Sequence, residues 1–289
     1  MIRCKGIEKR YGKKEILTNI SFEINEPKIV GLIGRNGVGK STLLRLLAGH
    51  VKPSDGQLEV MKQRPYQSLT VAANTIFIEE GMTFPNVLTL GELINVAPDF
   101  YLNFDKELAM KLLHYVGISE KGYHDQLSKG QKAAFNLIYG LASRSALTLL
   151  DEPMNGLDEA IRDDLYRVIL KDFIEYPRLI ILSSHYLNEL EHLIEDILLI
   201  HNGKVALFAP VEEVQQLAVK LIGQKEVMAP LIERLDVFAF RDNPPLYEAV
   251  VSQAPDSLPL GIRLQALSAS EVCKYITNER EGTIDDIYR

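Results

Sequence analysis

The sequence predicts an α/β fold in which helices cover a mostly parallel sheet, followed by a smaller α+β domain. Three apolar runs without polar alternation, at residues 28–33, 146–150 and 179–183, are typical of strands that are covered on both faces. A glycine-rich loop at 34–40 joins the first of these runs to a helical pattern. Strand, loop and helix in this order are typical of a parallel sheet between helices.

Around this sheet, the other elements follow from local patterns. The first thirty residues alternate as strands do and indicate antiparallel strands at the N-terminus. Residues 41–48 have helical spacing, and Gly49 ends that helix. Residues 57–60 predict a further strand after a Pro-Ser-Asp-Gly turn. Residues from about 84 to 128 are mainly helical in pattern and indicate a helical subdomain.

A change of character near residue 210 predicts the domain boundary. Before it, residues 197–208 read as a hairpin with a type I′ turn at Asn-Gly. The sequence thus predicts a nucleotide-binding domain over 1–210, a linker helix over 211–225 and an accessory domain over 226–289. Ser268 and Glu271 have the spacing of a capping box and indicate a last helix.

Composition narrows the class of protein. The 46% hydrophobic and 25% charged residues are ordinary for a globular protein, and no apolar run approaches the length of a membrane helix. The N-terminus lacks the apolar core of a secretion signal, which predicts an intracellular protein. Cys4 and Cys273 are expected to be free thiols. The net charge of −7 argues against direct binding to nucleic acid.

Residues 34–41, G-R-N-G-V-G-K-S, match the Walker A pattern G-x-x-x-x-G-K-[ST]. Glycines let backbone N–H groups turn toward a phosphate, and the N-terminus of the following helix adds its dipole. Lys40 is expected to meet the β- and γ-phosphates, Ser41 to ligate Mg²⁺, and Thr42 to contact the α-phosphate. The loop residues predicted to bind nucleotide are Gly34, Asn36, Gly37, Gly39, Lys40, Ser41 and Thr42.

Polar side chains at the ends of the other strands predict the rest of the site. Asp151 and Glu152 follow a buried strand, at the sheet edge where such folds bind ligands. Asp151 is expected to hold Mg²⁺, and Glu152 to orient the attacking water or take its proton. His185 ends the next strand and can donate to the γ-phosphate. Tyr11, 23 residues ahead of Gly34, can stack on adenine.

In order and spacing, these motifs resemble the ATPase subunits of ATP-binding cassette (ABC) transporters. Tyr11 is similar to the A-loop, L-S-K-G-Q at 127–131 to the signature, and L-T-L-L-D-E-P to Walker B. N-G-L-D at 155–158 is similar to the D-loop, and His185 to the switch histidine. The resemblance covers residues 1 to about 210 and implies a P-loop NTPase fold of the ABC type.

The resemblance also implies partners. In the family, two subunits face each other head to tail, and each signature caps the γ-phosphate bound by the other subunit's Walker A. Ser128, Gly130 and Gln131 would therefore contact the partner's ATP, and Asp158 of the D-loop would lie at the same site. The partner would be an identical or paralogous ATPase subunit. A separate transmembrane permease would dock on the helical subdomain and hold the chain at the cytoplasmic face of the membrane.

The chain departs from the family pattern at two places. Lys129 stands where the signature usually has its first glycine. The Q-loop glutamine has no counterpart, and Glu80 (or Glu79) is expected in its place as a ligand of Mg²⁺. The tail G-T-I-D-D-I-Y at 282–288 is similar to the closing motif of bacterial drug- and antibiotic-export ATPase subunits, which implies an exporter.

Two other classes of function compete with a transport motor. A soluble ABC ATPase acting on ribosomes or DNA typically has two cassettes or a long coiled coil, whereas this sequence has one cassette and an acidic balance. A nucleotide-sensing regulatory subunit that does not hydrolyse ATP is compatible with the missing glutamine. Lys40, Asp151, Glu152 and His185, all of which are present, favour hydrolysis.

Overall fold

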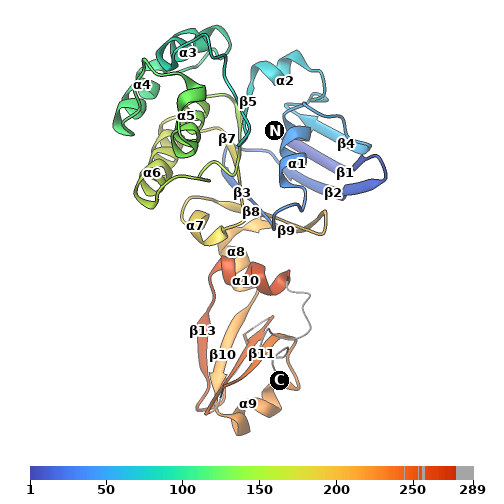
Figure 1. Ribbon diagram of the computed structural model, residues 1–289. Coiled ribbons are helices and arrows are strands. Elements are labelled where there is room, and N and C mark those ends of the chain that lie inside the picture. The colour runs from blue at the N-terminus through green and yellow to red at the C-terminus, as the bar shows by residue number, and fades with distance from the viewer. Residues whose placement is uncertain (244, 253, 256–257, 278–289) are drawn as a thin grey trace. The chain divides into compact units, whose positions relative to one another are not determined.

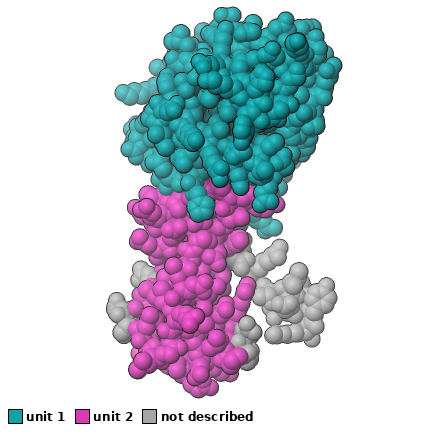
Figure 2. Space-filling view, turned by 90° about the vertical axis from the view of Figure 1, so that its left-hand side faces the viewer, with its two compact units in different colours: residues 1–185, 192–208 teal, residues 186–191, 209–289 magenta. Residues whose placement is uncertain are grey.

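A computed structural model describes residues 1–243, 245–252, 254–255 and 258–277. The chain forms two compact units, drawn in separate colours in Figure 2: residues 1–185 with 192–208, and residues 186–191 with 209–289. The motif at 282–288 that implies an exporter lies outside the described residues.

The first unit is built on a six-stranded sheet with the order β5-β6-β7-β3-β8-β9. Its strands are β3 (Ile29–Ile33), β5 (Thr75–Ile78), β6 (Leu147–Asp151), β7 (Leu179–Ser184), β8 (Asp196–His201) and β9 (Lys204–Pro210). The neighbours from β5 through β8 run parallel. All residues of β3 and β6 are buried, so the strands predicted from unalternated apolar runs are confirmed. Asn202 and Gly203 both have positive φ, 47° and 72°, as the predicted type I′ turn requires.

An antiparallel sheet faces the main sheet across a helix, as Figure 1 shows. Its strands are β1 (Ile2–Tyr11), β2 (Lys14–Ile24) and β4 (Asp55–Val60), in the order β2-β1-β4. The helix between the sheets is α1 (Lys40–Leu47). Its buried leucines share one apolar core with Ile7 and Ile20 of the antiparallel sheet and with Leu149 and Ile181 of the main sheet. This packing fixes the N-terminus of α1 at the carboxyl end of β3.

The predicted helical region is confirmed between β5 and β6. Its elements are α3 (Leu90–Val96), η1 (Ala97–Asp99), α4 (Lys106–Tyr115), η2 (His124–Gln126) and α5 (Lys129–Ala142), and α2 (Leu69–Ala73) precedes β5. The ring of Phe84 packs against His124, Phe135 and Tyr139, which joins the segment after β5 to α5. Burial in this cluster lowers the pKa of His124 below its ordinary value. In the described part of the chain, no helix is long and apolar enough to cross a bilayer.

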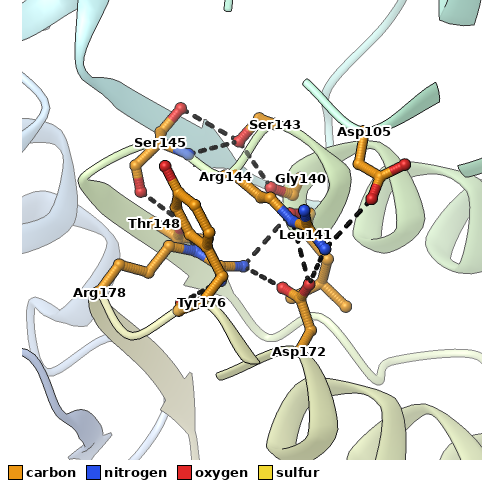
Figure 3. Close-up of polar contacts among 10 residues, drawn as sticks. All are labelled: Asp105, Gly140, Leu141, Ser143, Arg144, Ser145, Thr148, Asp172, Tyr176 and Arg178. Carbon is orange, nitrogen blue, oxygen red and sulfur yellow. Dashed lines mark hydrogen bonds and ion pairs between the residues drawn. The ribbon is translucent and has the colours of Figure 1, made fainter. Parts of the chain in front are cut away.

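A buried polar network lies at the amino ends of β6 and β7 (Figure 3). Asp172 of α6 (Glu159–Glu175) forms ion pairs with two cations: Arg178 Nη2 is 2.7 Å from its Oδ2, and Arg144 Nη2 is 3.2 Å from its Oδ1. Arg178 also donates to Thr148 Oγ1 at 3.3 Å and to the Leu141 carbonyl at 3.2 Å. The network therefore ties the C-terminal parts of α5 and α6 to the start of β6.

The second unit is an α+β fold. Its sheet contains β10 (Val219–Gly223), β11 (Val237–Asn243), β12 (Leu246–Val251) and β13 (Arg263–Ala266), in the order β11-β12-β10-β13. Its helices are α7 (Leu187–Leu190), α8 (Val211–Gln216), α9 (Lys225–Ile232) and α10 (Ala269–Ile276). The capping box of Ser268 and Glu271 that opens α10 is confirmed.

The linker helix predicted over 211–225 is wrong in its second half. The helix α8 ends at Gln216, and Val219–Gly223 forms β10, which lies inside the second sheet between β12 and β13. Buried Leu221 and Gly223 alternate with half-buried Lys220 and Ile222, which is the two-residue period of a strand. Pairing on both sides thus overrides the helical tendency of the preceding residues.

Candidate nucleotide site

The loop after β3 has the shape of a phosphate cradle. Gly37 and Gly39 have φ of 79° and 113°, in the left-handed region that favours glycine, and a Cβ on Gly39 would lie 2.6 Å from Leu17 Cδ2. The loop leads directly into α1, whose first turn contains no acidic residue. Among the described residues, no side chain caps this helix, so its N–H groups face the loop. An anion such as phosphate fits this end of the helix.

Lys40 lies at the centre of the site. Its buried ammonium group donates to the Gly34 carbonyl at 2.6 Å and lies 3.1 Å from Glu152 Oε1. The other oxygen of that carboxylate, Oε2, is 3.0 Å from His185 Nδ1. The three residues that the sequence predicted to be catalytic thus lie close together: Lys40 after the phosphate loop, Glu152 after β6 and His185 after β7.

Asp151 ends β6 and is oriented by a residue that sequence reasoning missed. Ser183 stands opposite Asp151 in the β6–β7 register, and its hydroxyl donates to Asp151 Oδ1 at 2.5 Å. The same hydroxyl accepts from the backbone N–H of Glu152 at 2.9 Å. A signal was present in the sequence, because Ser183 ends the neighbouring apolar run two residues before His185. Glu152 itself has φ of 48°, a strained conformation of the kind that is common at functional sites.

The donor atoms here fit Mg²⁺. Mg²⁺ is usually held by one or two protein oxygens together with phosphate oxygens and water. Ser41, at the start of α1, offers a hydroxyl group, and nearly buried Asp151 offers a carboxylate that Ser183 already holds in place. These are two of the ligands predicted from the sequence, and their role in binding Mg²⁺ stays a prediction.

Glu79 and Glu80 make contacts with cations. Arg45 Nη2 lies 2.6 Å from Glu79 Oε2, and Lys129 Nζ lies 2.6 Å from Glu80 Oε1. The expectation that Glu80 (or Glu79) ligates the metal stays a prediction. Both cationic partners were missed by sequence reasoning, because nothing in the local pattern links residues so far apart in the chain.

The signature residues and Asp158 of the D-loop form a second group, at the N-termini of α5 and α6. Ser128 and Gln131 make a reciprocal capping box at the exposed start of α5, with hydrogen bonds of 3.3 and 3.0 Å. Gly130 packs against the turn at 155–158, where a Cβ would lie 2.6 Å from the Gly156 carbonyl oxygen. Asp158 caps α6 by accepting from the Ile161 N–H at 3.0 Å. The close approach of residue 130 to the Gly156 carbonyl oxygen requires glycine at position 130.

A cavity of about 380 Å³ lies between Asp151 and Glu152 of the first group and residues of α5. Its lining residues include Asp151, Glu152 and Asn155, together with Glu80, Lys129 and Asn136.

Tyr11 ends β1 and is half-exposed, with Lys9 Nζ 4.8 Å from its ring centroid. Its stacking on adenine stays a prediction.

The chain is similar in sequence and fold to known ATP-binding proteins of ABC transporters. The family model described as ABC transporter matches residues 17–155. The lantibiotic transport ATP-binding protein SrtF of Streptococcus pyogenes is 32% identical over 72% of this chain and 90% of its own. The bacitracin transport ATP-binding protein BcrA of Bacillus licheniformis is 27% identical over 82% and 80%. A dimeric structure of MJ0796, a bacterial ABC transporter cassette, superposes with a TM-score of 0.64 at 21% identity, over 73% and 98% of the two chains.

The chain belongs to the ATP-binding proteins of ABC transporters. It is an ATPase subunit of such a transporter, which confirms the resemblance inferred from the motifs. The relatives do not favour a soluble ribosome- or DNA-directed ATPase or a nucleotide-sensing regulatory subunit.

Proposed function

We propose that two copies of this subunit, or this chain and a paralogue, hydrolyse MgATP in a head-to-tail dimer that drives a separate exporter permease. The observation that carries the proposal is the division of the site within one chain. Glu152 contacts both Lys40 and His185, whereas Ser128 caps an exposed helix start. An exposed, positively polarised helix end is suited to a phosphate held by another subunit.

In this proposal the residues have distinct roles. The glycine loop and the start of α1 bind the phosphates, and Lys40 turns from Glu152 toward the β- and γ-phosphate oxygens. Ser41 and Asp151 hold Mg²⁺, which neutralises charge on the phosphate oxygens when it is bound. Ser183 keeps the Asp151 carboxylate in one orientation. Glu152 orients the attacking water or accepts its proton, and His185 donates to the γ-phosphate.

Ser128, Gly130 and Gln131 close the partner's site from the other side. Tyr11 stacks on adenine, and Asp158 lies at the boundary between the two subunits. Release of the γ-phosphate removes the group that both subunits bind, so the dimer opens after hydrolysis. Support for such a dimer comes from the fold, which is that of a cassette described as dimeric.

The helical region is the proposed contact with the permease. Val87, Phe100 and Leu102, all in or beside this region, are largely exposed to solvent. Large exposed apolar side chains are typical of protein interaction surfaces when they gather in one region. The subunit would then sit at the cytoplasmic face of the membrane through its permease. Export as the direction of transport is supported by the names of two relatives, which refer to lantibiotic and bacitracin transport.

The Glu152→Gln variant tests the proposal. Without the carboxylate, hydrolysis should fall by about a hundredfold or more, while ATP remains bound between the subunits. Gel filtration with saturating MgATP should therefore show a dimer, and the same variant without nucleotide should elute as a monomer. The exposed acid Glu159 at the start of α6 provides the control, since Glu159→Gln should retain wild-type turnover. A Glu152→Gln protein that stays monomeric at saturating MgATP contradicts the shared site.

A further inference from the structure

Two adjacent carboxylates after β5 hold two different helices. Glu79 pairs with Arg45 of α1, through Nη2 at 2.6 Å and Nε at 3.1 Å. Glu80 pairs with Lys129, the first residue of α5, at 2.6 Å. The helix α1 carries the phosphate loop at its start, and α5 carries the signature at its start. The four residues Arg45, Glu79, Glu80 and Lys129 therefore form an ionic bracket between the last turn of α1 and the first residue of α5.

The lysine stem is guided by the neighbouring turn. A Cβ on Gly156, whose φ is 87°, would lie 3.2 Å from Lys129 Cγ and 3.4 Å from its Cε. The aliphatic chain thus lies over Gly156 on its way to Glu80. Beyond Glu80, the same segment is joined to α5 again by Phe84, whose ring packs against Phe135 and Tyr139. The segment after β5 is thereby fixed to α5 at both ends.

We infer that Glu80 and Lys129 are positioning residues, which keep the signature at a set distance from the phosphate loop of the same chain. The inference rests on the proposed head-to-tail dimer. In a two-fold symmetric dimer, both sites close together only if this distance is the same in both subunits. A subunit in which the distance varies must be ordered when the dimer forms, and that ordering weakens association.

The Glu80–Lys129 pair lies where the chain departs from the family pattern. Lys129 stands where the family has glycine, and Glu80 is one of the two candidates for the place of the missing glutamine; these two residues form one ion pair. The pair is exposed, with 68% and 56% of the side chains accessible, so its effect is moderate. Exposed pairs change an equilibrium by about two- to fivefold, and salt screens them.

The test uses the Glu152→Gln protein, which should hold the ATP-bound dimer. Adding Glu80→Gln or Lys129→Met should raise the protein concentration for half-dimerisation at saturating MgATP by about two- to fivefold. Both changes together should cost no more than either alone, because they remove the same pair. Binding of a fluorescent ATP analogue to the dilute Lys129→Met monomer should not change.

A matched control exists on α4. Glu107 and Lys111 form a pair at the same distance, 2.6 Å, with 78% and 71% accessible side chains, but both lie on one helix. Glu107→Gln and Lys111→Met should leave dimerisation unchanged. A harmless Glu80→Gln beside a damaging Lys129→Met would overturn the inference, since the lysine would then act on nucleotide directly.

The bracket can also be measured without any dimer. Spin labels on cysteines introduced at exposed Lys52, in the turn after α1, and exposed Asp125, ahead of α5, report the distance between the two helices. The natural cysteines are buried and should not react. The distance distribution should widen in Glu80→Gln and stay narrow in Glu107→Gln. An unchanged distribution overturns the bracket, whereas a widened one in a protein that never dimerises would contradict the dimer alone.

Discussion

Among single residues, Glu152 is held from two sides at once. Lys40 Nζ lies 3.1 Å from one carboxylate oxygen, and His185 Nδ1 lies 3.0 Å from the other. The backbone N–H of Glu152 is bound by the Ser183 hydroxyl, which helps to keep a left-handed φ that this residue type rarely adopts. When Lys40 turns to the phosphates, the contacts with His185 and Ser183 are still available to hold Glu152 in place, and fixed catalytic groups need little reorganisation during the reaction.

Ser183→Ala should lower the affinity of the site for Mg²⁺. The change removes the hydroxyl that donates to Asp151 and accepts from Glu152. Loss of such an outer hydrogen bond typically costs about 10- to 100-fold in metal affinity or activity. A titration of ATPase activity with Mg²⁺ should therefore shift to concentrations at least about tenfold higher.

Ser145→Ala is the control for that experiment. Ser145 also has a buried hydroxyl group, but it lies just before β6, at the opposite end of the strand from Asp151. Its Mg²⁺ titration should match that of the wild type. Equal Mg²⁺ dependence in Ser183→Ala and wild type would show that Asp151 needs no orienting partner.

At the scale of elements, the carboxyl ends of β6 and β7 hold the site residues, and the amino ends of the same strands hold the buried polar network. The β6–β7 register sets Asp151 beside Ser183, while Arg178 and Thr148 meet near the starts of the same strands. Asp172 of α6 is buried between Arg178 and Arg144 and binds the helix to this end of the sheet. The strands are thus anchored far from the nucleotide.

Asp172→Asn should destabilise the fold without directly altering the site. The substitution leaves Arg178 buried without its carboxylate, and breaking a buried ion pair in this way costs about 3–5 kcal/mol. Thermal or urea unfolding should show this loss. Below the lowered Tm, the ATP concentration for half-maximal activity should stay close to that of the wild type.

Asp163, exposed on the same helix, provides the comparison. Asp163→Asn should unfold at nearly the wild-type temperature, because a surface substitution usually changes stability by less than about 0.5 kcal/mol. If the two variants unfolded alike, the network would contribute nothing to stability.

For the whole molecule, the first unit contains every residue that the proposal uses for ATP. It presents them as two groups, the phosphate-loop side with Lys40 and the signature side with Ser128. A head-to-tail pair brings each group to the complementary group of the other chain. One defective chain can then be rescued by a chain that is defective at the other group.

Mixing Lys40→Met with Ser128→Arg measures this directly. Each variant alone should be inactive, because every site in its homodimer is damaged. In an equal mixture, random pairing makes half of the dimers mixed, and each mixed dimer has one intact site of two. Activity should therefore return to about a quarter of the wild-type value. A site built within one chain predicts no recovery at any mixing ratio.

The sequence by itself determined the motifs, the core strands and the class of protein. Unalternated apolar runs gave β3, β6 and β7, and the glycine spacing gave the phosphate loop, because such patterns depend on near neighbours in the chain. The capping box at Ser268 is local in the same sense.

Only the tertiary structure decided which distant side chains meet. Ser183 binds Asp151 because β6 and β7 pair in one register. Glu79 pairs with Arg45, and Glu80 pairs with Lys129, because β5 ends between α1 and α5. Residues 219–223 became a strand because two neighbouring strands were there to pair with them. Each of these outcomes depends on hydrogen bonds and charges from remote parts of the chain, which no local pattern encodes.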